Sequence, residues 1–263
     1  MNIKTWTDKK TMKGAEPIFL PGNKKTGVLL FHGWTSSPQE FNPDYTPSTA
    51  KYLNELGYTV YVPLRLGHGT TPEDFSKLRW EDWLEDAKDH YRLFSNECEG
   101  VVVGGMSMGA SLALHIASEN PIAGVMPMGT PIFMKMHWLF VPWALLSRHN
   151  YRMRHKRYLP KDQEIAAKKI HYTQYPNHHI FENLKASRET RKILPAIKAP
   201  ALILHSADDN IAHPRSAKYI YNHISSTDKK IVLIKDSYHS FTTDRNAKVA
   251  SEAMGEFLGK IDT

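Results

Sequence analysis

The apolar residues of this chain fall into short continuous runs, separated by longer stretches in which apolar residues recur at helical spacing. A run of β-branched and aliphatic residues, roughly four to eight long, is typical of a strand buried on both faces of a sheet. Such runs predict strands at 28–31, 58–62, 101–104, 122–126, 201–205 and 231–234. The stretches between them predict helices at 47–56, 80–93, 110–117, 215–223 and 247–258. This alternation implies an α/β fold with a mostly parallel sheet covered by helices on both faces.

The alternation is interrupted once, between about residues 131 and 191. This stretch is rich in Met, Trp, Tyr, His, Lys and Arg and has no clear strand pattern. The change predicts a segment inserted into the sheet-forming chain. We therefore expect an α/β core made of residues 1–130 and 191–263, with residues 131–190 forming a cap.

The composition is that of a soluble globular protein and excludes several other classes. At 263 residues the chain can bury one large core, and its single cysteine, Cys98, permits a reducing compartment. The first ten residues contain no apolar signal-like segment, and no stretch is long and apolar enough to span a membrane. The formal charge of +7 comes from scattered Lys and Arg, without a nucleic-acid-binding motif. We expect a cytoplasmic protein that binds no nucleic acid; the sequence does not indicate its oligomeric state.

The segment Gly105–Gly109 reads Gly-Met-Ser-Met-Gly and lies between a predicted strand and a predicted helix. In this context a Gly-x-Ser-x-Gly pattern is typical of a nucleophile elbow. The sharp turn strains the serine backbone and exposes the hydroxyl, and only glycine fits two residues before and after it. The helix that follows directs N–H groups and its positive dipole end toward a developing oxyanion. A glycine-rich turn with a chance serine is the alternative, but the strand–turn–helix setting favours Ser107 as a nucleophile.

A serine hydroxyl needs a base to take its proton, and in open α/β sheets functional groups lie at the carboxyl ends of strands. Asp208 and Asp209 follow the strand at 201–205, and His239 follows the strand at 231–234. The order Ser, Asp, His along the chain is that of an α/β-hydrolase triad. His239 would be the general base and acid, oriented by an aspartate. Position alone does not choose between Asp208 and Asp209.

The sequence His32-Gly33-Trp34 ends an early strand, where the second N–H group of an oxyanion hole is expected. We assign the two donors to the backbone N–H groups of Trp34 and Met108. His32, and His68 between two glycines, are interpreted as structural braces of their loops rather than as proton carriers.

Several segments resemble a known family. They are Glu16-Pro17, Pro21-Gly22, GVLLFHGWT (27–35), GHGT (67–70), GMSMG (105–109), ISSTDKKIV (224–232) and SYH (237–239). Together they are similar to the bacterial carboxylesterases and monoacylglycerol lipases, which have the α/β-hydrolase fold, over nearly the whole chain except the cap.

The resemblance also implies which carboxylate is the acid. In that family the acid lies four residues after the His or Gln that ends its strand and five before a proline, and counting from His205 and Pro214 gives Asp209. The sequence departs from the family at Trp34, where phenylalanine is usual, and at Ser206, where glycine is usual. Neither departure removes a catalytic group, and the larger Trp34 would narrow the acyl pocket.

The expected cap begins with an apolar, methionine-rich segment at 131–143, which is followed by a basic stretch at 148–157. Methionine suits flexible apolar ligands, so Met136 and Trp138 are candidate acyl contacts. Packing within the cap is the alternative and ranks slightly ahead, although both can hold. A basic stretch beside an apolar one can also make weak contact with an anionic membrane surface, although a solvated cap face is the favoured interpretation.

The sequence thus predicts a serine hydrolase that cleaves small carboxylic esters through an acyl-enzyme, with no metal or organic cofactor. The resemblance implies monoacylglycerols or esters of short to medium acyl chains as substrates. Another serine chemistry on this fold is the main alternative: a cinnamoyl esterase, thioesterase, C–C hydrolase or perhydrolase. A non-catalytic binding protein of this fold would be expected to lack a triad member, and a dehalogenase would carry aspartate at the elbow.

Overall fold

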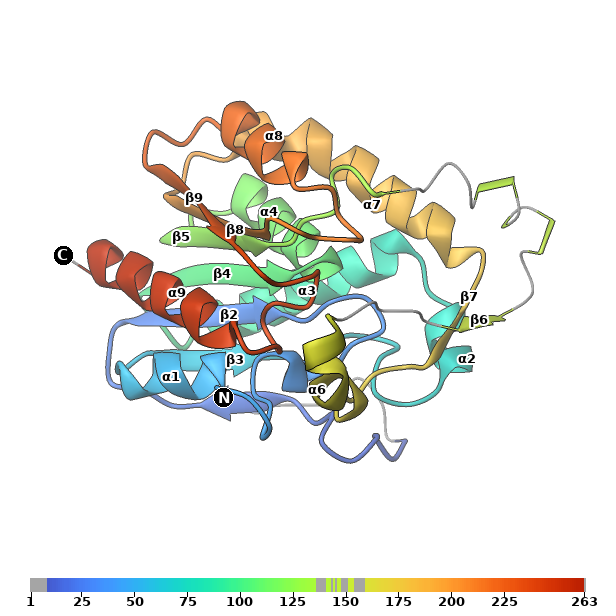
Figure 1. The fold of residues 1–263 in the computed structure, drawn as a ribbon. Helices are drawn as coiled ribbons and strands as arrows, with labels where there is room; N and C mark the ends of the chain where they lie inside the picture. The colour runs from blue at the N-terminus through green and yellow to red at the C-terminus, as the bar shows by residue number, and fades with distance from the viewer. Residues whose placement is uncertain are drawn as a thin grey trace.

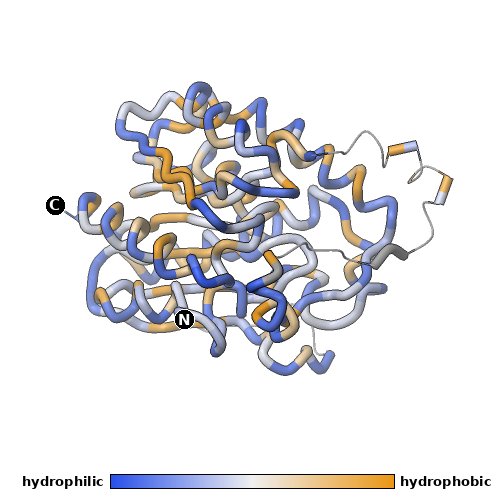
Figure 2. Tube along the Cα trace, in the orientation of Figure 1, coloured by the Kyte–Doolittle hydropathy of each residue, from blue (hydrophilic) through white to orange (hydrophobic). Residues whose placement is uncertain are grey.

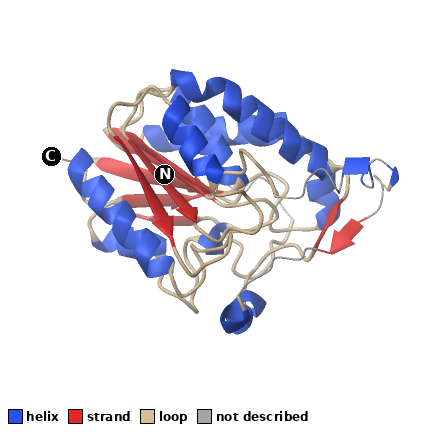
Figure 3. Cartoon of the chain, turned by 45° about the horizontal axis from the view of Figure 1, so that its top comes forward, coloured by secondary structure: helices blue, strands red, loops and turns tan. Residues whose placement is uncertain are grey.

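The computed structural model describes residues 9–135, 141–142, 144, 146–147, 151–153 and 159–262. Within them, a seven-stranded sheet has the order β1-β3-β2-β4-β5-β8-β9 (Figures 1 and 3). Neighbouring strands are parallel except β1, which pairs antiparallel with β3. The strands are β1 (Ile18–Leu20), β2 (Thr26–Phe31), β3 (Thr59–Val62), β4 (Gly100–Met106), β5 (Gly124–Met128), β8 (Ala201–Ser206) and β9 (Lys229–Ile234). The prediction of a mostly parallel sheet is confirmed.

Helices cover both faces of this sheet. Helices α1 (Thr49–Glu55) and α9 (Ala247–Ile261) lie on one face, and α3 (Trp80–Ser95), α4 (Met108–Glu119) and α8 (Arg215–His223) lie on the other. The remaining described helices are α2 (Pro72–Ser76), α6 (Gln163–Ala167) and α7 (His179–Ile193), with 3₁₀ turns at Pro38–Glu40, Pro160–Asp162 and Leu194–Ala196. Alternate residues of β2 point to opposite faces: Val28 and Leu30 join the core under α1 and α9, whereas Leu29 and Phe31 join the core under α3, α4 and α8. Figure 2 shows many hydrophobic positions along the strands between these two layers.

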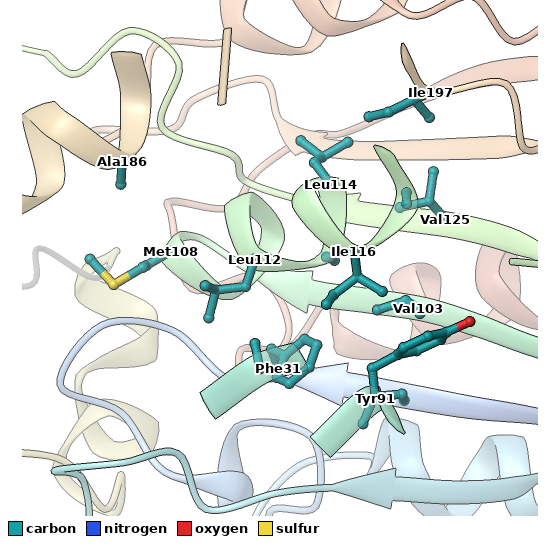
Figure 4. Close-up of a cluster of buried hydrophobic side chains, with 14 of the residues drawn as sticks. Phe31, Tyr91, Val103, Met108, Leu112, Leu114, Ile116, Val125, Ala186 and Ile197 are labelled. Atoms are coloured by element: carbon teal, nitrogen blue, oxygen red, sulfur yellow. The ribbon is translucent and has the colours of Figure 1, made fainter. Parts of the chain in front are cut away.

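Helix α4 lies in the same layer as α3 and α8. Every residue of α4 from Met108 to Ala117 is buried. Figure 4 shows Leu112 and Ile116 directed toward Phe31 and the neighbouring core. A helix that is apolar on all sides packs inside the protein rather than on its surface. The helix that follows the turn at Ser107 is therefore fixed by its packing in the core.

The structure differs from the expected elements in several places. Strand β5 begins at Gly124, two residues later than expected, because Gly124 is where pairing with Val102 starts. Strand β1 and helix α7 were not predicted, and the expected cap boundary at residue 190 falls inside α7. Within residues 131–190 the structure also contains a two-stranded antiparallel pair, formed by β6 (Tyr151–Met153) and β7 (Gln174–Pro176).

Candidate active site

Ser107 occupies the turn between β4 and α4. Its backbone has φ 58° and ψ −118°, a positive-φ conformation that residues other than glycine rarely adopt. The Ser107 N–H donates to the carbonyl of Met128 at 2.8 Å, and the Ser107 carbonyl accepts from the N–H of Ala110 at 3.0 Å. The strained conformation is thus held between two buried elements, as expected of a nucleophile elbow.

The two glycines that flank Ser107 have no room for a side chain. A Cβ at Gly105 would overlap the backbone of Gly109, and a Cβ at Gly109 would overlap the carbonyl of Phe31 at the end of β2. The sequence predicts glycine at both positions from the shape of the turn. The structure adds a second reason for Gly109, which is the close approach of α4 to β2.

His239 follows β9 and lies between Ser107 and Asp209. Its Nε2 is 2.9 Å from Oγ of Ser107, and its Nδ1 is 2.7 Å from Oδ2 of Asp209. The imidazole is buried, with 4% of its residue surface exposed. The residues at the carboxyl ends of β4, β8 and β9 therefore form one continuous hydrogen-bonded chain.

Asp209 is fully buried and its carboxylate is bound on both oxygens. Oδ1 accepts from the N–H groups of Ile211 and Ala212 at 2.8 and 2.9 Å, while Oδ2 faces His239. Burial opposes ionisation of this carboxyl, but His239 and the hydrogen bonds prevail and hold the pKa of Asp209 below its ordinary value. Asp209 is thus an ionised acceptor with a fixed orientation.

The other two nearby carboxylates have partners other than His239. Asp208 is exposed, and its Oδ2 accepts from the N–H of Asp236 at 3.3 Å. Asp236 is also exposed and forms an ion pair with Lys161. Of the two aspartates that follow β8, only Asp209 reaches the imidazole.

His205, the histidine within β8, contacts the same carboxylate. Its Nε2 lies 3.2 Å from the carbonyl of Ala212 and 3.4 Å from Oδ2 of Asp209. Burial lowers the pKa of His205, so the ring is neutral and its Nε2–H can donate toward both oxygens. In the sequence His205 serves only to count toward the acid, and nothing there indicates this contact.

The N–H groups of Trp34 and Met108 lie at the ends of two adjacent strands. Phe31 of β2 pairs in register with Gly105 of β4, which brings the loop after β2 beside the turn that carries Ser107. Within the described part of the chain, the Trp34 N–H has no hydrogen-bond acceptor. Met108 is the first residue of α4, where N–H groups lack a partner within the helix.

Two buried histidines support this loop. His32 Nε2 accepts from the N–H of Arg65 at 3.3 Å, and its Nδ1 is 3.1 Å from the carbonyl of Gly33. His68 Nε2 lies 3.2 Å from Nη2 of Arg65, and its Nδ1 is 3.0 Å from the carbonyl of Leu66. Burial holds the pKa of both imidazoles well below the ordinary value. Both rings are therefore neutral, which fits the bracing role interpreted from the sequence.

Buried charged groups that the sequence did not predict also contact the loop. The Gly33 N–H donates to Oε2 of Glu40 at 2.5 Å, and Nζ of Lys169 lies 2.8 Å from Oε1 of the same carboxylate. On the other side, the Gly33 carbonyl accepts from Nη2 of Arg65 at 3.0 Å. These residues are far apart in the chain and form no local motif that sequence reasoning could recognise.

The candidate acyl contacts Met136 and Trp138 lie outside the described residues. The described part of the same segment does contact the site, because the Trp34 ring packs against Tyr175 with ring centroids 4.4 Å apart. Phe75 packs against Trp34 as well, with centroids 5.9 Å apart. The tryptophan that departs from the usual family residue is thus in contact with residues 131–190.

The described residues contain neither a membrane-spanning helix nor a metal-binding cluster. No helix there is both long and apolar enough to cross a bilayer. No group of three or more His, Cys, Asp or Glu side chains in the same residues is arranged to hold a metal ion.

Comparison with known proteins shows the family to which the chain belongs. A family model described as serine aminopeptidase, S33, matches residues 22–246. The chain belongs to this hydrolase family. Among its relatives, the thermostable monoacylglycerol lipase of Bacillus sp. (strain H-257) is 31% identical over 256 residues, covering 95% of this chain and 96% of the relative. The carboxylesterase of Bacillus subtilis (strain 168) is 28% identical, and the match covers 94% of this chain and 97% of the relative. The resemblance stated from the sequence motifs is confirmed.

Solved structures of hydrolases agree with the fold. One structure comes from work on LipS and LipT, two metagenome-derived lipolytic enzymes. It superposes with a TM-score of 0.81 at 29% identity, and the superposition covers 95% of this chain and all of the other. A soluble variant of monoglyceride lipase from Saccharomyces cerevisiae superposes with a TM-score of 0.78 at 18% identity. The superposition covers 100% of this chain and 98% of the other. The α/β-hydrolase fold expected from the sequence is confirmed.

Proposed function

We propose that this protein hydrolyses carboxylic esters through an acyl-enzyme formed on Ser107, with monoacylglycerols or esters of short to medium acyl chains as substrates. The observation that carries the proposal is the hydrogen-bonded chain from Ser107 Oγ through His239 to the buried carboxylate of Asp209. The monoacylglycerol lipase and carboxylesterase among its relatives support the substrate class.

In the first half of the reaction, Ser107 Oγ attacks the ester carbonyl carbon while Nε2 of His239 takes the hydroxyl proton. The carbonyl oxygen becomes an oxyanion, which the N–H groups of Trp34 and Met108 bind. A donor of this kind is worth about 10²- to 10³-fold in rate. Asp209 accepts from Nδ1–H, keeps the imidazole in the correct tautomer and stabilises the imidazolium.

In the second half, the imidazolium of His239 gives its proton to the alcohol oxygen, the C–O bond breaks and the alcohol leaves. A water molecule then gives a proton to Nε2 and attacks the acyl carbon. Collapse of the second oxyanion releases the carboxylic acid, and the proton returns to Ser107 Oγ. These steps use only residues of this chain and water.

We extend the proposal to residues 131–190 as a cap, with Met136 and Trp138 in contact with the acyl chain. The packing of Trp34 against Tyr175, which belongs to this segment, supports a cap that lies over the site. A cytoplasmic location and a weak contact of the cap with membrane surfaces belong to the same proposal. The single cysteine supports the first, and the basic stretch at 148–157 supports the second.

A panel of p-nitrophenyl esters and monoacylglycerols of graded chain length tests the proposal, together with labelling by a fluorophosphonate probe. We expect the wild-type protein to hydrolyse these esters and to take up one probe per chain. Ser107→Ala should lose ~10⁴-fold or more in kcat, take up no probe and keep its circular dichroism spectrum. A large fraction of wild-type turnover in this variant would contradict the assignment. A strong preference for thioesters or hydroxycinnamoyl esters would change the substrate class but leave Ser107 as the nucleophile.

A further inference from the structure

Gly33 lies between two buried charges of opposite sign. Its N–H donates to the Glu40 carboxylate at 2.5 Å, and its carbonyl accepts from the Arg65 guanidinium at 3.0 Å. Glu40 and Arg65 are 1% and 0% exposed. The Gly33 carbonyl also accepts from the N–H of Ser36 at 3.1 Å, which closes a turn over Trp34. The backbone on both sides of Gly33 is therefore held by charge-assisted hydrogen bonds, which are stronger than neutral ones.

The two charges differ in how they are compensated. Glu40 forms a buried ion pair with Lys169, whose Nζ lies 2.8 Å from Oε1. Arg65 has no carboxylate within ion-pair distance among the described residues, and within the same residues its Nε and Nη1 have no hydrogen-bond partner. Burial lowers the pKa of Arg65 to about 10, so the guanidinium stays charged at neutral pH.

The carboxylates of Asp86 and Glu40 favour the charge of Arg65 from beyond ion-pair distance. A buried guanidinium without a directly paired carboxylate still destabilises a fold, because attraction at longer range restores only part of the hydration it loses. The charge of Arg65 therefore needs an explanation other than stability. Its two hydrogen bonds go to the Gly33 carbonyl and to His68, and burial keeps His68 neutral. Of the two hydrogen-bond partners of the guanidinium, only the Gly33 carbonyl belongs to the loop that carries Trp34.

The Gly33 carbonyl and the Trp34 N–H belong to one planar peptide group and point in opposite directions. A cation at the carbonyl polarises the peptide and makes its N–H a stronger donor. The hydrogen bond from Arg65 also prevents rotation of this peptide group. Such a rotation would turn the Gly33 carbonyl, instead of the Trp34 N–H, toward the oxyanion. The next residue, Thr35, has φ 58°, so the turn is strained and depends on such support.

We propose that Arg65 is a positioning residue of the oxyanion hole, which directs the Trp34 N–H toward the oxyanion and strengthens it as a donor. Glu40 has the complementary task of fixing the preceding peptide through the Gly33 N–H. This inference rests on the proposed function, in which Trp34 is an oxyanion donor. Because the oxyanion carries its charge only in the transition state and the tetrahedral intermediate, Arg65 contributes to kcat rather than to substrate binding.

Arg65→Met and Arg65→Lys test this role, with Lys24→Met as the matched control. Lys24 is also a cation with two hydrogen bonds, to Tyr58 and Asp262, but it precedes β2 and lies at the opposite end of the strands. Each variant is assayed with p-nitrophenyl butyrate, and rates are divided by the number of sites that a fluorophosphonate titrates. The transition-state probe is an alkyl trifluoromethyl ketone: Ser107 Oγ adds to its carbonyl carbon, His239 takes the proton and the ketone oxygen becomes the anion.

We expect Arg65→Met to lower kcat by about 10- to 100-fold, with KM changed less than about twofold. Its affinity for the trifluoromethyl ketone should fall by a similar factor, while its affinity for the product acid should stay the same. The ¹³C resonance of the hemiketal carbon, followed against pH, should give an oxyanion pKa about one unit higher than in the wild type. Arg65→Lys should recover part of the loss, because it restores the charge but not the planar geometry. Lys24→Met should match the wild type per titrated site.

Wild-type kcat and ketone affinity in Arg65→Met, measured per titrated site, would overturn the proposal. If Arg65→Met does not fold, Arg65→Lys decides: a loss of ketone affinity without a loss of acid affinity supports the proposal, and unchanged affinities overturn it. A wild-type protein that neither hydrolyses esters nor takes up the probe would overturn the proposed function, and this inference with it. The two failures are thus distinguishable.

Discussion

Asp208 and Asp209 are adjacent in the chain but lie in different surroundings. Asp209 is fully buried and bound by two N–H groups and by His239, whereas Asp208 is exposed. Asp208 accepts from the N–H of Asp236 alone among the described residues outside its own turn, whereas three hydrogen bonds keep the carboxylate of Asp209 in one place. Only the buried residue can set the orientation of the imidazole.

Asp209→Asn should therefore lower kcat by ~10³- to 10⁴-fold with little change in fold, because an amide keeps the shape but stabilises the wrong tautomer. The matched variant Asp208→Asn should lose less than about tenfold. Steady-state kinetics on one soluble ester, with circular dichroism as the check on folding, compares the two. Reversed effects would move the acid to Asp208, and two mild effects would direct attention to Asp236.

The residues of the site differ in how well the sequence revealed them. Ser107 and His239 stand at predicted strand ends, where chemistry on an α/β sheet is expected. Asp209 needed the spacing of a related family, because its neighbour occupies the same strand end. Glu40 and Arg65 gave no signal, because buried charges are rare and their contacts with Gly33 arise only in the folded chain.

At the scale of the secondary-structure elements, α7 shows why part of the fold escaped prediction. Its buried residues recur at helical spacing, but most are polar. They are His179, Glu182, Asn183, Ala186, Ser187 and Thr190. Hydrophobic periodicity finds strands such as β2 and helices such as α9, but it cannot find a polar face that packs on α4. Strand β1 was missed for another reason, since three residues become a strand only by pairing with β3.

The ion pair between Glu40 and Lys169 joins the loop after β2 to the chain that leads into β7. Burial raises the pKa of Glu40, but Lys169 and the Gly33 N–H outweigh it and lower the pKa from 4.5 to about 2. A depressed carboxyl pKa stabilises the fold above the unfolded value and loses this effect as pH falls through the folded value. The wild-type protein should therefore lose stability as pH falls from 4.5 toward 2.

Glu40→Gln should be less stable by about 3 kcal/mol at pH 7, because it leaves Lys169 buried without its partner. Its free energy of unfolding should also change less with pH in the acid window. Urea denaturation at several pH values measures both effects. Glu40→Gln combined with Lys169→Met should recover part of the loss, whereas Glu99→Gln, in an exposed ion pair with Lys25, should match the wild type. An acid profile of Glu40→Gln identical to that of the wild type would contradict this account.

At the scale of the whole molecule, the site is assembled from the carboxyl ends of four strands. Trp34 follows β2, Ser107 follows β4, Asp209 follows β8 and His239 follows β9. Strands β2 and β4 are neighbours, while the strand between them in sequence, β3, lies on the other side of β2. Such a reversal of strand order opens a crevice at the carboxyl edge, where α/β proteins bind their ligands.

Residues 131–190, which enter the chain after β5, should set the acyl preference. Met136→Ala or Trp138→Ala should change the ratio of kcat/KM between short and medium acyl chains by ~10-fold, the size expected for a lost pocket contact. The matched control is Leu146→Ala in the same segment, where the side chain is 91% exposed. A chain-length profile unchanged by alanine at positions 133–143 would count against the role of the cap.

His239 follows β9, the strand at one edge of the sheet. This position determines which part of the site is lost first when the protein begins to unfold. Strand β9 pairs only with β8 among the described residues, and Leu233 at its edge is 51% exposed. Edge elements with few buried contacts open at lower free energy than the global transition. Fraying of β9 would withdraw the imidazole while Ser107 and the oxyanion loop stay on the central strands. Amide hydrogens of β9 should thus exchange faster than those of β4, and urea should end turnover before it unfolds the core. Turnover of this protein would then report the integrity of one edge of its sheet.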